Sequence, residues 1–107
     1  METQIQKYVN QLADEFNVRS EQGAEEMQKI VDELIEDSLD VRYVVGAKGE
    51  YVACKFLIAF GGPNVWFDTE SAAIEGCWSS DEAEAWLQPD LIEYVDDYMS
   101  EVWKGTR

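Results

Sequence analysis

A period-two alternation in the middle of the chain constrains the fold most strongly. Over residues 51–60 every second side chain from Val52 to Phe60 is apolar, and the intervening set is mixed and includes Lys55. Successive side chains of a strand point to opposite faces, so this pattern is typical of a strand that packs on a core from one side. We therefore expect a small sheet centred on this strand, with helices covering its apolar face.

Three amphipathic helices are predicted, two before the sheet and one after it. Apolar residues recur at helical spacing over residues 3–17, where Thr3 is the expected N-cap, and over residues 24–38. A third apolar stripe runs from Leu91 to Val102, with Pro89 in the first turn and Gly105 at the end. A polar linker that ends at Gly23 separates the first two helices.

Short connections join the predicted strands, and none is long enough for a parallel crossover. The sequence therefore predicts an α+β fold: a four-stranded antiparallel meander with two N-terminal helices and one C-terminal helix packed on it, forming a single α+β domain over residues 1–107. Residues 79–82 resemble a helix N-cap, so residues 83–87 are left open as a helical turn or an edge strand. The four strands are expected at residues 41–45, 51–60, 65–68 and 73–78.

Composition indicates a folded chain in a reducing compartment. Hydrophobic residues make up 46% and aromatic residues 12% of the 107 positions, whereas disordered acidic chains are poor in both. Cys54 and Cys77 both fall in predicted strands and are expected to be small buried hydrophobes, although a disulfide stays open if their strands are adjacent. Neither a signal peptide nor a membrane span is indicated, so we expect a cytoplasmic protein.

The sequence carries no recognisable catalytic constellation. Histidine is absent, two thiols do not make a zinc site, and no phosphate-binding glycine motif is present, so no catalytic, metal or cofactor site is predicted. The remaining enzymatic hypothesis is a carboxylate pair, because Asp68, Glu70 and Glu75 lie on or between adjacent predicted strands. Such a pair would support acid–base hydrolysis.

Charge is the strongest functional signal. The chain has 23 acidic and 8 basic residues, a net charge of −15, which should repel nucleic acid and anionic membranes and attract basic protein surfaces. The acids concentrate in residues 21–40 and 81–101, and many stand four apart, which spaces carboxylates about 6 Å apart along a helix. The candidate partner-binding residues are Glu25, Asp32, Glu33, Glu36, Asp37, Asp40, Asp90, Glu93, Asp97 and Glu101.

A resemblance extends this interpretation. The run FGGPNVWFDTESAAIEGCWSSDEA is similar to stretches of small acidic proteins carried by phages and mobile elements, and the likeness covers roughly residues 51–103. In size and charge the chain also resembles DNA-mimic inhibitors of bacterial defence, of the anti-CRISPR and antirestriction type. The resemblance implies a non-enzymatic inhibitor in the host cytoplasm that occupies the nucleic-acid groove of a basic partner, such as a CRISPR effector or restriction enzyme.

Two other interpretations of these features stay open. The acidity could serve only solubility, with a partner recognised through exposed aromatic residues near Trp66, Trp78 and Trp86, since tryptophans are frequent binding hot spots. The oligomeric state, including a homodimer, is not decided by the sequence.

Overall fold

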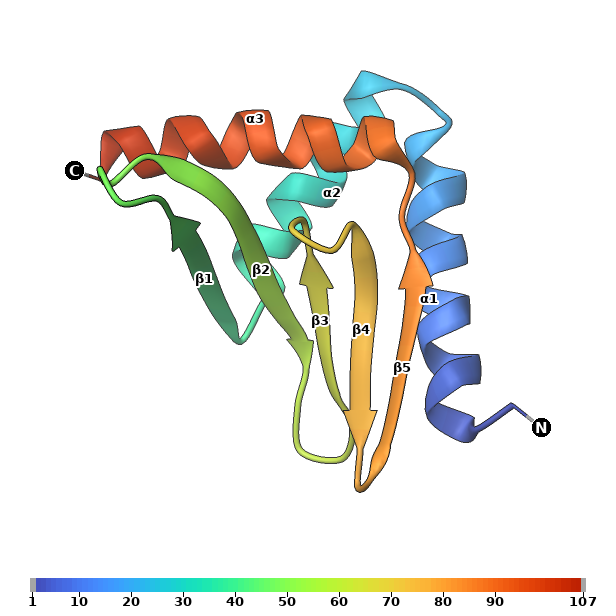
Figure 1. The fold of residues 1–107 in the computed structure, drawn as a ribbon. Helices are drawn as coiled ribbons and strands as arrows, with labels where there is room; N and C mark the ends of the chain where they lie inside the picture. The colour runs from blue at the N-terminus through green and yellow to red at the C-terminus, as the bar shows by residue number, and fades with distance from the viewer. Residues whose placement is uncertain (1, 107) are drawn as a thin grey trace.

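A computed structural model of the chain, which describes residues 2–106, contains three helices and one five-stranded antiparallel sheet (Figure 1). The strands lie side by side in chain order, so every connection within the sheet is a hairpin. The helices are α1 (Gln4–Ser20), α2 (Ala24–Asp37) and α3 (Pro89–Gly105). The strands are β1 (Asp40–Val45), β2 (Tyr51–Ala59), β3 (Asn64–Asp68), β4 (Ala73–Trp78) and β5 (Asp81–Trp86).

The α+β class, the antiparallel meander and the helix arrangement agree with the prediction, but the sheet has a fifth strand. Residues 79–82 do not begin a helix. Instead Ser79, with φ of 58°, turns the chain so that Trp78 pairs with Asp81. Period-two alternation continues through β5, where Ala83 is buried under α1 and Glu84 is exposed. The extra strand also makes β3, rather than β2, the middle of the sheet.

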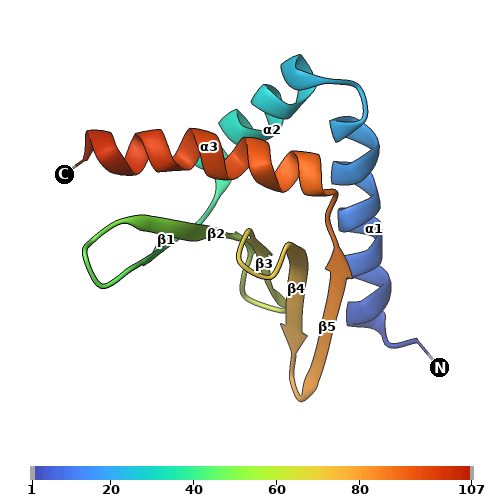
Figure 2. The same ribbon diagram turned by 45° about the horizontal axis from the view of Figure 1, so that its top comes forward.

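All three helices pack on one face of the sheet. α1 lies on β4 and β5, whereas α2 and α3 lie on β2 and contact each other (Figures 1 and 2). The approach of α1 is close at Gly76, where an added Cβ would meet Val9 Cγ2 at 2.6 Å. The large fully buried side chains form one core from the three helices and strands β2–β4: Ile5, Val9, Ile30, Val31, Cys54, Phe56, Val65, Phe67, Ile74, Leu91, Val95 and Met99.

Local signals at the helix ends are confirmed. Thr3 Oγ1 accepts a hydrogen bond from the Gln6 amide at 3.2 Å, as an N-cap does. α1 continues to Ser20, three residues further than predicted, and Gly23, with φ of 111°, then precedes α2. Pro89 occupies the first turn of α3, where its missing N–H costs nothing.

The alternation in β2 holds in the middle of the strand and fails at its ends. Cys54 and Phe56 are fully buried, as expected. Val52 is 50% exposed because the register shifts beside it, and Phe60 is 70% exposed because the strand ends at Ala59. The same shift turns Tyr51 toward α3, where its hydroxyl donates to Asp96 Oδ1 at 2.6 Å.

The two cysteines behave differently. Both are free thiols on strands separated by β3, so they do not form the disulfide that was left open. Cys54 is buried, and burial raises the pKa of its thiol to about 11. Cys77 is exposed, so its predicted burial is wrong: its side chain lies on the face of the sheet that no helix covers.

Among residues 2–106, no helix combines the length and the apolar character needed to cross a membrane.

Candidate functional site

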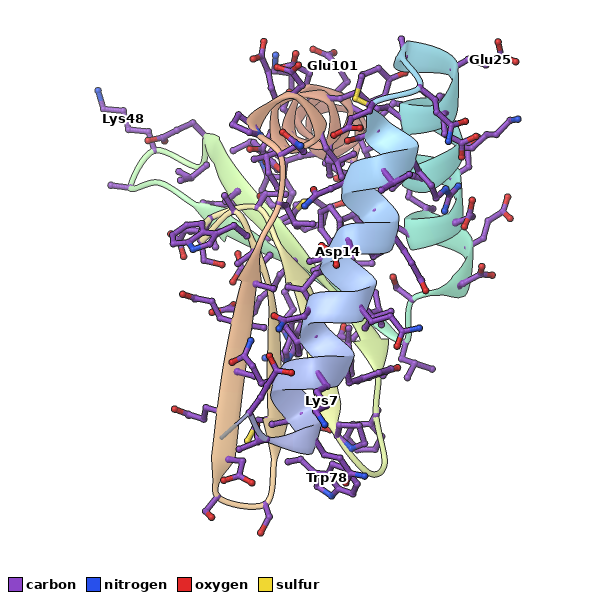
Figure 3. The ribbon with its side chains drawn as sticks, turned by 90° about the vertical axis from the view of Figure 1, so that its right-hand side faces the viewer. Lys7, Asp14, Glu25, Lys48, Trp78 and Glu101 are labelled. Carbon is purple, nitrogen blue, oxygen red and sulfur yellow. The ribbon has the colours of Figure 1, made fainter. Side chains whose placement is uncertain are left out.

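The outward side of α2 carries a row of carboxylates. Ile30, Val31 and Leu34 are buried against the rest of the molecule, so the opposite side of the helix faces solvent. That side presents Glu25, Asp32 and Glu36, together with Lys29. Figure 3 shows Glu25 pointing away from the sheet.

The outward side of α3 carries a second row. Leu91, Val95 and Met99 are buried, and the solvent-facing side presents Asp90, Glu93, Asp97 and Glu101. In Figure 3, in which α3 is seen nearly end-on, Glu101 points away from the sheet. Lys104 Nζ lies 3.4 Å from Glu101 Oε1, so the base at the end of this helix is engaged locally.

The two helices that carry these rows are neighbours. α2 and α3 are in direct contact, and Tyr94 Oη donates to Gln28 Oε1 at 2.6 Å where they meet. Both lie on the same side of the sheet, and Figure 2 shows α3 crossing in front of α2. The outward acids of α2 and of α3 are therefore carried by two adjacent helices.

Four of the ten predicted acids do not belong to a free outward row: Glu101, which pairs with Lys104, and Glu33, Asp37 and Asp40. Arg19 of α1 contacts Glu33 at 2.5 Å and Glu26 at 2.7 Å, and its hydrogen bond to Glu33 lowers the pKa of that carboxyl. Asp37 lies beside α1 and lines a small cavity with Tyr8, Phe16 and other residues.

Asp40 is a clearer correction. The helix ends at Asp37, so Asp40 does not continue the series of Asp32 and Glu36 as its four-residue spacing suggested. Asp40 is instead the first residue of β1, and its carboxylate pairs with Arg42 at 2.9 Å.

The candidate interaction site is therefore smaller than predicted. We call it the acidic helix surface and define it by the exposed outward acids for which no ion pair within 4.0 Å is found among residues 2–106. Its members are Glu25, Asp32 and Glu36 on α2, and Asp90, Glu93 and Asp97 on α3.

The uncovered face of the sheet holds a second group that charge counting did not reveal. By strand register, Arg42, Lys55 and Trp66 lie on this face. Lys55 Nζ is 4.6 Å and Arg42 Cζ is 5.4 Å from the centroid of the Trp66 ring, within the range of cation–π contacts. Period-two alternation combined with the strand order could have placed these side chains together.

Two carboxyls meet on the same face. Asp68 and Glu75 are diagonal neighbours on β3 and β4, and burial together with a hydrogen bond to Asp68 raises the pKa of Glu75 to about 7. Glu70, the third predicted carboxylate, is exposed in the turn, where its amide donates to Asp68 Oδ1 at 2.8 Å. A cavity of about 660 Å³ beside Glu75 is lined by Trp66, Glu84 and neighbouring residues. In residues 2–106, no cluster of three or more acidic, histidine or cysteine side chains is arranged to hold a metal ion.

The tryptophans do not form one cluster. Trp86 is 70% and Trp78 is 44% exposed, and they lie at opposite ends of the β4–β5 hairpin; Figure 3 shows Trp78 at the lower end. Trp66 is partly covered by the two cationic side chains. Trp103 packs against Tyr43 with the two rings tilted, and its Nε1 donates to Gly49 O at 3.1 Å. Two exposed indoles are therefore separate candidate anchors.

A scan against protein-family models finds no match, and searches of curated proteins and of solved structures find no significant similarity.

Proposed function

We propose that this protein is a non-enzymatic acidic binding protein that acts as a DNA mimic. Its acidic helix surface would occupy the nucleic-acid groove of a basic partner and exclude the nucleic acid from it. CRISPR effectors and restriction enzymes, the targets implied by the resemblance, are basic partners of this kind.

The observation that carries the proposal is that α2 and α3 touch each other while six of their outward acids have no ion pair among residues 2–106. Like charges four residues apart cost a few tenths of a kcal/mol per pair. This repulsion occurs between Asp32 and Glu36 on α2 and between Glu93 and Asp97 on α3. Carboxylates about 6 Å apart on each ridge present repeated negative charge, as the phosphates of a nucleic-acid strand do.

Solubility alone is a weaker account of this distribution. A solubilising surface needs negative charge anywhere on the molecule, and it does not require like charges four residues apart on one helix, which cost free energy. Among residues 2–106, eight acids without an ion pair within 4.0 Å lie on α2 and α3 and eleven lie elsewhere, so the spacing of the acids on two neighbouring helices, rather than their number, favours an interaction surface.

A capture experiment tests the proposal. The chain is immobilised and exposed to a bacterial lysate at low salt, and captured proteins are eluted by raising the salt concentration. We expect a captured protein that binds DNA or RNA, is released by salt because the interaction is electrostatic, and is displaced by added duplex DNA. Capture that resists both high salt and competing DNA would contradict a mimic.

Aromatic recognition is the second candidate, and the exposure of Trp86 favours it. Trp86 and Leu87 line a hollow with Pro89 and Ile92 at the start of α3. A partner anchored there would bind with little salt dependence and would lose affinity at least about tenfold on Trp86→Ala, as hot-spot tryptophans do. The matched control is Trp78→Ala, which removes an exposed indole from the other end of the hairpin.

A further inference from the structure

The two edge strands of the sheet, β5 and β1, differ in whether other parts of the chain cover them. Along β5, side chains of α1 bond the outward carbonyl groups: Gln6 Nε2 donates to Glu84 O, and Asn17 Nδ2 donates to Trp86 O, both at 3.0 Å. Figure 1 shows α1 running beside this edge and, within residues 2–106, no helix or strand beside β1 at the other edge. An uncovered edge strand presents free N–H and C=O groups to another chain.

The register identifies which groups of β1 are free. In an antiparallel pair, residues alternately direct both backbone groups toward and away from a given neighbour. The carbonyl and amide of Cys54 are bonded on the β3 side, to the amide and hydroxyl of Thr69 at 3.0 and 2.9 Å. Its β1 partner, Tyr43, therefore directs its own groups outward, and by alternation so do Val41 and Val45.

The usual protections of an edge strand are missing from β1. It contains no proline, and the extra residue at the register shift, Val52, belongs to β2. Its one cationic side chain, Arg42, lies over Trp66 and so extends across the open face. Val45, at the end of the strand, is an exposed apolar residue.

Charge favours this edge as a meeting point for two copies. Residues 40–59 contain the acids Asp40 and Glu50 and the bases Arg42, Lys48 and Lys55, a net charge of +1 in a chain of −15. When two copies approach through β1, residues 40–59 of one copy meet the same residues of the other, and the electrostatic repulsion between these segments is small. The acidic helix surface on α2 and α3 takes no part in this contact.

We propose that β1 is a homodimer interface, in which two copies pair their β1 strands antiparallel about a two-fold axis. With Tyr43 opposite Tyr43 of the second copy, Val41 faces Val45, and all three outward residues of each copy take part, giving about six backbone hydrogen bonds. Asp40 then lies opposite Gly46 of the second copy, at the start of the hairpin loop that carries Lys48, so opposite charges approach at both ends.

Sedimentation measurements from micromolar to millimolar concentration test the interface with a matched pair of variants. Val41→Pro removes an outward N–H that the monomer does not use, whereas Val41→Thr keeps it at nearly the same side-chain volume. We expect wild type and Val41→Thr to form dimers, and Val41→Pro to associate at least about tenfold more weakly with an unchanged circular dichroism spectrum. Added salt should strengthen dimerisation, because it screens the repulsion between two acidic chains.

A monomer at every concentration would overturn the proposal, as would a folded Val41→Pro that dimerises like wild type. If Val41→Pro does not fold, amide hydrogen exchange of the wild-type protein tests whether β1 forms the dimer interface. The amides of Val41, Tyr43 and Val45 should become protected as concentration rises, while that of Val44, bonded within the hairpin, is protected throughout. Concentration-independent exchange at the three outward amides would exclude the interface.

Discussion

The pair formed by Glu75 and Asp68 is the clearest case in which neighbouring charges change the chemistry of one residue. Burial, a hydrogen bond to Asp68 and repulsion from Asp68 and Glu84 raise the pKa of Glu75 to about 7, against the opposing effect of Lys55. A carboxyl of this kind can exchange a proton near neutral pH.

The raised pKa predicts how stability depends on pH. The protonated Glu75 is favoured in the folded state, so its contribution is complete below the unfolded pKa of about 4.5 and is lost as pH rises through about 7. Glu75→Gln should remove this dependence and raise the free energy of unfolding at pH 8 by on the order of 1 kcal/mol, after allowance for solvent screening. Urea unfolding of wild type and Glu75→Gln at about pH 5 and pH 8 measures this difference in the free energy of unfolding.

Glu82→Gln on β5 is the control, because this exposed acid is not among the groups that shift the pKa of Glu75. If the free energy of unfolding falls from about pH 5 to about pH 8 by the same amount in wild type and in Glu75→Gln, a group other than Glu75 causes the pH dependence.

Arg19 connects α1 to α2 and predicts a second difference in stability. Arg19→Met keeps most of the apolar stem but leaves Glu26 and Glu33 without their cation, so we expect a loss of about 1 kcal/mol in the free energy of unfolding. Lys104→Met breaks the single exposed pair with Glu101 and should cost close to nothing. Equal effects in thermal unfolding would contradict the specific role of Arg19.

At the scale of elements, the contact between α1 and the sheet depends on Gly76. A Cβ there would come within 2.6 Å of Val9 Cγ2 and about 3.0 Å of Ile5 Cδ1, so Gly76→Ala should push α1 away from β4 and cost about 1–3 kcal/mol. Gly62→Ala is the control, because a Cβ at Gly62 meets nothing within 4 Å. Denaturant midpoints of the two variants measure the difference, and equal midpoints would show that α1 tolerates the displacement.

Most elements could be predicted from local patterns, and the failures have local physical causes. Thr3, Pro89 and the apolar stripes define the helices because capping and burial act within a few residues. The fifth strand was left open because Ser79 and Ser80 suit a helix N-cap and a tight turn equally well. Asp40 was assigned to a helical row because a four-residue spacing does not reveal that the helix ends at Asp37.

The candidate site was harder to predict because it depends on tertiary contacts. Spacing identified the outward acids of α2 and α3, but not that Arg19, from another helix, engages Glu33. The group around Trp66 needed the strand register, since Lys55, Asp68 and Glu75 come from three different strands. Charge patterns along a sequence show where acids concentrate, and only the packing shows which of them stay free.

For the whole molecule, the central claim is that the position of the negative charge matters, and not only its amount. Charge reversal at Asp32, Glu36, Glu93 and Asp97, each to lysine, changes the net charge from −15 to −7 because every reversal adds two charges. The matched control reverses four exposed acids on α1 and at the start of β5, with the same net charge. Its four positions are Asp14, Glu15, Asp81 and Glu82.

The most direct test measures how well wild type and these two variants displace duplex DNA from the captured nucleic-acid-binding protein, at low and high salt. We predict that the control variant competes nearly as well as wild type. The variant reversed on α2 and α3 should be at least about tenfold weaker, with a smaller salt dependence. Equal competition by the two variants would contradict the account, because net charge alone would then explain binding.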